Sequence, residues 1–165
     1  MKLIKLDAID STNEFLKGIS NKEDLENFTV VTAENQTNGK GQMGSAWNSE
    51  VGKNLIMSVL IKDFLFEIHE IFNLNIAVSL AVLTTLKKKD IPALSIKWPN
   101  DILSANKKIG GILIENSIKS DGTILSIVGL GLNVNQTNFE GLPKASSLAV
   151  VVSQELDKEE LLFDI

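Results

Sequence analysis

Apolar residues in this chain fall into short, β-branched runs separated by polar turns, and longer stretches between them have helical spacing. The short runs predict β-strands at 2–7, 28–33, 55–61, 94–98, 101–104, 109–118 and 123–132. Helices are expected at 11–19, at 74–89 and from about residue 157 onward. The first helix opens with a capping-box pattern, because Ser11 stands three residues before Glu14. Since hairpins follow in the second half, the pattern predicts an α+β fold.

The composition removes several classes of function. Among 165 residues, 16 Lys and Arg stand against 21 Asp and Glu, and the formal net charge of −5 argues against a nucleic-acid partner. All of the cations are lysines, so any phosphate or carboxylate must be held by ammonium groups and backbone N–H groups. The chain has no cysteine, and His69, its only histidine, is expected to have no role. A thiolate nucleophile and a multi-histidine zinc site are therefore excluded.

No stretch of the sequence has the pattern of a targeting or membrane segment. The first seven residues carry a charge at every second or third position, without the apolar core of a signal peptide. The most apolar run, 74–86, is interrupted by Asn75, Ser79, Thr84 and Thr85 and is too short to span a bilayer. A cytoplasmic protein with no membrane partner is therefore expected.

A polar loop at 34–49 contains the first candidate for chemistry. Its segment Gly39-Lys40-Gly41-Gln42-Met43-Gly44 matches the G-x-G-x-x-G pattern. In a dinucleotide-binding fold the third glycine opens a helix, whereas here it leads into Ser45-Ala46-Trp47 and a strand. Ser45 also stands where a P-loop needs lysine. The remaining interpretations are an anion-binding loop with exposed N–H groups and one cation, or a plain surface loop.

Further segments place glycine or amide residues at the ends of strands. Lys97-Trp98-Pro99-Asn100-Asp101 puts polar groups at a bend, although an Asx turn has the same pattern. Segment 107–115 has two adjacent glycines inside a good strand, and 129–135 opens with glycines and ends in amides. Each pattern is ordinary by itself, as is a helix cap at 11–13. Together they indicate a ligand that lies against bare backbone.

In their order along the chain, these segments resemble those of bacterial biotin protein ligases. The similar stretches are Ser11-Thr12-Asn13, the loop from Gln36 through Gly39-Lys40-Gly41, Lys97-Trp98-Pro99-Asn100-Asp101, Lys108-Ile109-Gly110-Gly111, 129–133 and Ala145-Ser146-Ser147-Leu148. The resemblance implies that residues 1–165 form a biotin ligase catalytic domain, with a mixed, largely antiparallel sheet backed by helices. It also implies an enzyme that uses ATP and Mg²⁺ to convert biotin into biotinyl-5'-adenylate. The biotin then passes to a lysine of a biotin carboxyl carrier protein or domain.

The resemblance implies a role for individual residues by their position in the motifs. Biotin would be bound by Ser11, Thr12, Asn13, Gln36, Gly39, Lys40, Gly41, Gln42, Lys108, Gly110 and Gly111. The nucleotide would be bound by Lys40, Trp47, Lys97, Asn100, Lys108 and Asn133. The catalytic residues would be Lys108, Lys40 and Asp101, with Lys108 between the biotin carboxylate and the α-phosphate. Asp101 would either bind Mg²⁺ or orient the acceptor lysine, and the sequence leaves that choice open.

The chain also departs from the family pattern. The family loop usually carries arginines where this chain has Lys40 and Gln42. No DNA-binding helix-turn-helix precedes the catalytic region, so repressor activity is not expected. As for the oligomeric state, a homodimer is an option. The chain stops at Ile165, so the small C-terminal β-barrel of most members would be missing or truncated. The alternative functions are a lipoate or octanoate ligase or transferase of the same fold, and a truncated module that only binds biotin or its carrier.

Overall fold

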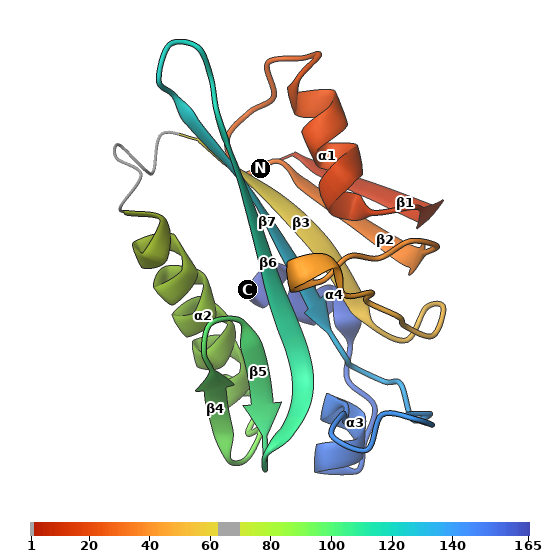
Figure 1. Ribbon diagram of the computed structural model, residues 1–165. Coiled ribbons are helices and arrows are strands. Elements are labelled where there is room, and N and C mark those ends of the chain that lie inside the picture. Colours follow the sequence, from red (N-terminus) through yellow and green to blue (C-terminus); the bar gives the residue numbers. More distant parts are fainter. Residues whose placement is uncertain (1, 63–69) are drawn as a thin grey trace.

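The computed structural model describes residues 2–62 and 70–165, which form a single sheet with helices on both faces (Figure 1). Its elements are β1 (Leu3–Ile9), α1 (Thr12–Ser20), β2 (Val30–Gln36), the 3₁₀ turn η1 (Gln42–Gly44), β3 (Leu55–Lys62), α2 (Ile71–Lys88), β4 (Leu94–Lys97), β5 (Asp101–Ser104), β6 (Lys107–Ile118), β7 (Ile124–Leu132), α3 (Leu148–Val152) and α4 (Lys158–Asp164). Each predicted strand is present within a few residues of its expected bounds. His69 lies outside the described residues.

The described strands join one seven-stranded sheet in the order β1-β2-β3-β7-β6-β5-β4. β1 and β2 are parallel, with α1 as the crossover between them, and all other neighbouring pairs are antiparallel. The hairpin between β5 and β6 turns at Ala105 and Asn106, whose positive φ angles of 47° and 65° suit a two-residue turn. The predicted α+β fold with a mixed, largely antiparallel sheet is therefore confirmed.

Successive side chains of the central strands point to opposite faces of the sheet. The register pairs Gly129 of β7 with Ser58 of β3 and with Leu113 of β6, so these three positions share one face. α1 covers part of that face, and its Leu16 is buried in a cluster with Leu25, Val31, Leu60 and Ile127. α2, α3 and α4 contribute to the larger core cluster with residues of the opposite face. The part of the α1 face next to the N-terminus of this helix holds the site.

Helix α2 is longer than the sequence pattern suggested. It spans 18 residues, and its Leu74, Val82 and Leu86 are buried. Lys87 and Lys88 lie in its last turn, where cations stabilise the carbonyl end of a helix. Among the described residues it is the one helix that could cross a membrane by length and composition, a test that core helices of soluble proteins also pass.

The start of α1 differs from a complete capping box. Ser11 is the N-cap, and its Oγ accepts a hydrogen bond from the backbone N–H of Glu14 at 3.5 Å, as predicted. In a complete capping box, the side chain of Glu14 would accept a hydrogen bond from the backbone N–H of Ser11. Here that N–H donates instead to Oδ1 of Asp10 at 2.7 Å. The carboxylate of Glu14 is therefore available to another partner.

The five-residue helix α3 was not predicted from the sequence. Its run of Leu-Ala-Val-Val-Val has a poor helix propensity, because three of the five residues are β-branched. The N-cap Ser147, whose side chain accepts from the N–H of Val150, and the fully buried Leu148 fix the helix instead. Tertiary packing therefore outweighs the local propensity here.

Candidate functional site

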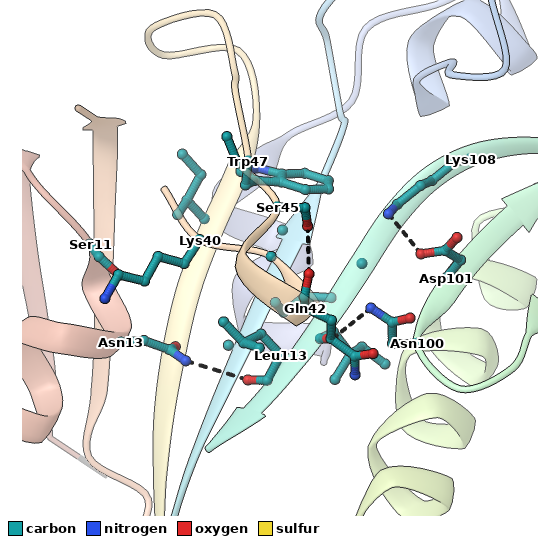
Figure 2. Close-up of a pocket in the computed structure, with 18 of the residues that line it drawn as sticks. Ser11, Asn13, Lys40, Gln42, Ser45, Trp47, Asn100, Asp101, Lys108 and Leu113 are labelled. Atoms are coloured by element: carbon teal, nitrogen blue, oxygen red, sulfur yellow. Dashed lines mark hydrogen bonds and ion pairs between the residues drawn. The ribbon is translucent and has the colours of Figure 1, made fainter. Parts of the chain in front are cut away.

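A cavity of about 340 Å³ opens on the α1 face of the sheet (Figure 2). β3, β6 and β7 form its floor, the first turn of α1 and the end of β2 form one end, and the turn between β4 and β5 forms the other. The loop from β2 to β3 completes the lining. The polar and charged lining residues are Ser11, Thr12, Asn13, Gln36, Lys40, Gln42, Ser45, Lys97, Asn100, Asp101 and Lys108.

The glycines of the floor make room for side chains of the protein itself. A Cβ at Gly131 would lie 2.5 Å from Cε2 of Trp47, and a Cβ at Gly129 would lie 2.4 Å from Oδ1 of Asn13. Gly111 continues the same surface, and a Cβ there would lie 3.4 Å from Cζ3 of Trp47. The bare backbone that the sequence assigned to a ligand is thus partly covered by Trp47 and Asn13. Both side chains belong to the lining of the cavity.

The α1 end of the cavity is a buried network of hydroxyl and amide groups. Thr12 donates from both its backbone N–H and its Oγ1 to Oε1 of Gln36, at 2.8 and 3.0 Å. Ser58 Oγ lies 2.8 Å from Thr12 Oγ1 and 2.6 Å from Asn13 Oδ1. Thr12, Asn13 and Ser58 are each less than 5% exposed. This end can therefore recognise a neutral polar group through hydrogen bonds.

The loop from β2 to β3 folds into a tight hairpin over residues 39–47. Trp47 N–H donates to the carbonyl of Gly39 at 2.9 Å, and Gly41 N–H donates to the carbonyl of Ser45 at 2.7 Å. A Cβ at Gly39 would lie 2.4 Å from the carbonyl oxygen of Trp47, so this close backbone approach requires glycine. Met43 lies at the tip with a positive φ of 54° and is fully exposed.

Lys40 of this hairpin is held by the first turn of α1. Its Nζ donates to Oε1 of Glu14 at 2.7 Å, using the carboxylate that the helix cap does not need. The hydrogen bond from Lys40 holds the pKa of Glu14 below its ordinary value, and the same bond raises the pKa of Lys40. In Figure 2 the Lys40 side chain extends towards Ser11, away from Lys108. The two lysines that were predicted to be catalytic therefore lie at different ends of the cavity.

Lys108 stands at the other end, on β6. Its Nζ lies 2.7 Å from Oδ1 of Asp101 and 5.7 Å from the centroid of the Trp47 ring. Its backbone is fixed by the segment around Ala145, since Lys108 N–H donates to the carbonyl of Lys144 at 2.7 Å and its own carbonyl accepts from Ser146 N–H at 2.9 Å. The Ala145-Ser146 motif thus supports the strand that carries the lysine.

Among the described residues that line the cavity, Asp101 is the one with an acidic side chain. Its carboxylate also lies 3.8 Å from Nζ of Lys97, so it faces two cations. Nearby, Nε1 of Trp47 is buried and has no hydrogen-bond partner in the described part of the chain. Within residues 2–62 and 70–165, no group of three or more His, Cys, Asp or Glu could hold a metal ion.

Most of the predicted site residues meet at this cavity. Those that line it are Ser11, Thr12, Asn13, Gln36, Lys40, Gly41, Gln42, Trp47, Lys97, Asn100, Asp101, Lys108 and Gly111. Gly39, Gly110 and Asn133 are not part of its lining. Asn133 is 6% exposed, and its Nδ2 donates to the carbonyl of Ser146 at 3.0 Å, so its amide joins β7 to the segment before α3.

Sequence reasoning missed two polar residues beneath the cavity. Ser58 interrupts the apolar run of β3, and that interruption was a usable signal. Glu115 follows the glycine-rich part of β6, and its Oε2 accepts from Nδ2 of Asn13 at 2.8 Å. No local pattern marks Glu115, because its partner lies 102 residues away in the sequence.

Comparisons with known proteins agree with this geometry. A bifunctional ligase/repressor BirA of Bacillus spizizenii is 32% identical over 152 residues, which is 92% of this chain and 46% of the relative. A biotin--[acetyl-CoA-carboxylase] ligase of Mycobacterium tuberculosis is 32% identical over 142 residues, which is 84% of this chain and 51% of the relative. The structure of the biotin protein ligase from Aquifex aeolicus in complex with biotin and ATP matches with a TM-score of 0.82 and 32% identity, over 99% of this chain and 66% of that chain.

The chain thus spans about half the length of the curated relatives that it matches. The family model described as the biotin/lipoate A/B protein ligase family matches residues 6–135, which include the α1 cap, the hairpin over the cavity, Asp101 and Lys108. On this match, and on the fold that it shares with a solved ligase, the chain belongs to the biotin/lipoate A/B protein ligase family.

Proposed function

We propose that this protein is a cytoplasmic, ATP-dependent biotin ligase that makes biotinyl-5'-adenylate and transfers biotin to a lysine of a biotin carboxyl carrier domain. The observation that carries the proposal is the polarity of the cavity. Hydroxyl and amide groups line the α1 end, where the charge of Lys40 is paired with Glu14, and Lys108 with Asp101 lies at the other end (Figure 2). Biotin has the matching order of groups, with a neutral urea head and a carboxylate tail. The names of the relatives support the same substrate.

The α1 end suits the urea head for an energetic reason. A buried urea N–H or C=O without a partner would cost about 1–3 kcal/mol, so each needs a hydrogen bond from the protein. Thr12 and Gln36 offer a hydroxyl, an amide N–H pair and an amide oxygen within one network. Trp47 and Leu113, which also line the cavity, provide apolar surface for the rest of the ligand. We infer that the head group binds against Thr12 and Gln36.

The first step would take place beside Lys108. A carboxylate oxygen of biotin attacks the α-phosphorus of ATP, the bond to the β-phosphate oxygen breaks, and pyrophosphate leaves. Two anions must meet, and a fixed cation between them offsets their repulsion as charge builds in the transition state. The contacts of Lys108 support this role, because Asp101 holds its Nζ and the segment around Ala145 holds its backbone. Lys108 would exchange Asp101 for the reacting oxygens.

The nucleotide would lie over the same end of the cavity. Lys97 and Asn100 line it there, and Trp47, which also lines the cavity, offers a ring face. Mg²⁺ usually binds through one or two carboxylates together with substrate phosphates. The single carboxylate of Asp101 fits that arrangement, with most ligands supplied by ATP.

The second step needs a neutral amine on the carrier. A lysine has a reference pKa of about 10.4, so at neutral pH only about one in a few thousand is unprotonated. The amine attacks the carbonyl carbon of the mixed anhydride, AMP leaves, and the amine proton must be accepted. Asp101 is the acid at the cavity and would attract this lysine and take its proton. If this role is correct, Asp101→Asn slows transfer from preformed biotinyl-adenylate more than it slows adenylation; the reverse order assigns Asp101 to Mg²⁺.

Exchange of labelled pyrophosphate into ATP tests the proposal. Exchange that depends on biotin is the expected result. Exchange that depends on lipoate or octanoate and not on biotin would instead show the alternative ligase of the same fold. Biotin binding by calorimetry without any exchange would show a module that only binds. A second assay, labelling of a carrier domain in the presence of ATP, tests the transfer step.

A further inference from the structure

A continuous chain of side-chain hydrogen bonds runs from Glu115 on β6 to Gln36 on β2. Oε2 of Glu115 accepts from Nδ2 of Asn13 at 2.8 Å, and Oδ1 of Asn13 lies 2.6 Å from Oγ of Ser58. Ser58 Oγ is 2.8 Å from Thr12 Oγ1, which is 3.0 Å from Oε1 of Gln36. Glu115 is not part of the cavity lining, whereas Thr12, Asn13 and Gln36 are. Any influence of Glu115 on a ligand must therefore pass through Asn13.

The protons along this chain can be arranged in two directions. In one direction Asn13 donates to Ser58, Ser58 donates to Thr12, and Thr12 donates to Gln36. Each of these contacts then has its own proton, but Asn13 Oδ1 would face Glu115. In the other direction Asn13 donates to Glu115, and Ser58 donates to Asn13. The single hydroxyl proton of Thr12 is then shared between two acceptors, Ser58 and Gln36.

Glu115 decides between the two directions. An ionised carboxylate only accepts hydrogen bonds, so an amide oxygen facing it would leave two acceptors in contact without a proton. The carbonyl of Leu113 adds a second acceptor on the same side, 3.4 Å from Nδ2 of Asn13 (Figure 2). Both N–H groups of Asn13 therefore point to β6, and its oxygen points to Ser58. Because Asn13 and Ser58 are 4% and 0% exposed, water cannot readily substitute for either contact.

We propose that Glu115 is a positioning residue for head-group recognition, since it fixes the orientation of the Asn13 amide and thereby directs the Ser58 proton to Asn13 and away from Thr12. This inference rests on the proposed function only in naming the ligand as a urea. With the amide fixed, Ser58 donates to Asn13, so Thr12 Oγ1 keeps its acceptor side free for a ligand while its own proton goes to Ser58 or Gln36. The N–H groups of a urea need such an acceptor.

Glu115→Gln and Glu115→Leu test the proposal, because they first weaken and then remove the hydrogen bond that residue 115 accepts from Asn13. Glutamine can still accept from Asn13 but without charge, and the difference between a charged and a neutral hydrogen bond predicts about a fivefold higher KM for biotin. Leucine removes the acceptor, and the increase should be on the order of tenfold or more. The kcat and the KM for ATP should stay within about twofold, because Glu115 does not contact the reacting groups. A purely structural fault would change all three parameters.

Lys17→Gln is the matched control. Nζ of Lys17 lies 3.9 Å from Oε1 of Glu115, so this variant removes the ion pair and leaves the bond to Asn13. It should bind biotin like the wild type. A Lys17→Gln variant that reproduces the Glu115→Leu defect would assign the effect to the ion pair and overturn the proposal, as would an unchanged biotin KM in Glu115→Leu.

A measurement without ligand separates this inference from the proposed function. The side-chain NH₂ signals of Asn13, identified by their loss in Asn13→Asp, should be protected from solvent exchange in the wild type and in Lys17→Gln. They should shift and lose protection in Glu115→Leu. Unmoved signals overturn the positioning role even if the enzyme uses biotin. Shifted signals in a protein that does not bind biotin support the role and refute only the ligand.

Discussion

Replacing Gly129 with alanine should destabilise the protein by about 2–4 kcal/mol. A Cβ at this position would lie 2.4 Å from Oδ1, 3.0 Å from Cγ and 3.1 Å from Nδ2 of Asn13. Asn13 cannot move aside cheaply, because it is 4% exposed and held by Ser58 and Glu115. Overpacking typically costs about 1–3 kcal/mol, and a buried polar group left unpaired costs about another 1–3 kcal/mol. The lower chain entropy of alanine returns about 0.5–1 kcal/mol.

Urea unfolding of the wild type, Gly129→Ala and Gly111→Ala measures this effect. Gly111 is the matched control on the neighbouring strand, because its Cβ would meet nothing closer than 3.4 Å, which is ordinary contact. Its replacement should cost less than about 1 kcal/mol. In a chain of this size the Gly129 variant should also melt roughly 4–16 °C lower.

A double-mutant cycle identifies the cause. If the clash is with Asn13, Gly129→Ala should cost almost nothing in an Asn13→Ala background, so the two changes would be strongly non-additive. The reasoning is refuted if the two single changes add, or if Gly129→Ala is as stable as Gly111→Ala.

Three further changes test other parts of the site. Lys108→Ala should lower adenylate formation roughly 10²–10³-fold while weakening biotin binding less, because the cation acts mainly in the transition state; equal losses in rate and affinity contradict this. Gln42→Arg should slow the release of biotinyl-adenylate several-fold in an off-rate measurement, since a charge-assisted hydrogen bond is worth about 1 kcal/mol more than a neutral one. Equal off-rates in the wild type and the variant would mean that backbone N–H groups hold the phosphate. Glu14→Gln should lower the free energy of unfolding at neutral pH, because Lys40 holds the pKa of Glu14 below its ordinary value. A lowered folded-state pKa stabilises the protein above the unfolded-state value, so the difference between wild type and variant should vanish as pH falls through the lowered pKa, and a difference that persists in acid is the contrary result.

Local patterns in the sequence were sufficient for the described strands and for every described α-helix except α3, and they marked most of the cavity lining. The Ser11 cap, the turns and the strands depend on neighbours in the chain, so each could be predicted from a short window. The motif around Asp101 and the lysine at 108 were recognised in the same way, and both reach the cavity. The resemblance to a known family, which rests on the order of these motifs along the chain, indicated that they belong to one site.

The tertiary structure alone decided which partner each polar group has. Glu14 was predicted to close a helix cap, but the fold brings Lys40 to it, 26 residues away. Asn133 lies outside the cavity lining because its amide joins two segments of the interior. Glu115 meets Asn13 across 102 residues, and only the strand register places them on the same face. Because a shift of one residue in register would send a side chain to the opposite face of the sheet, sequence windows cannot contain that information.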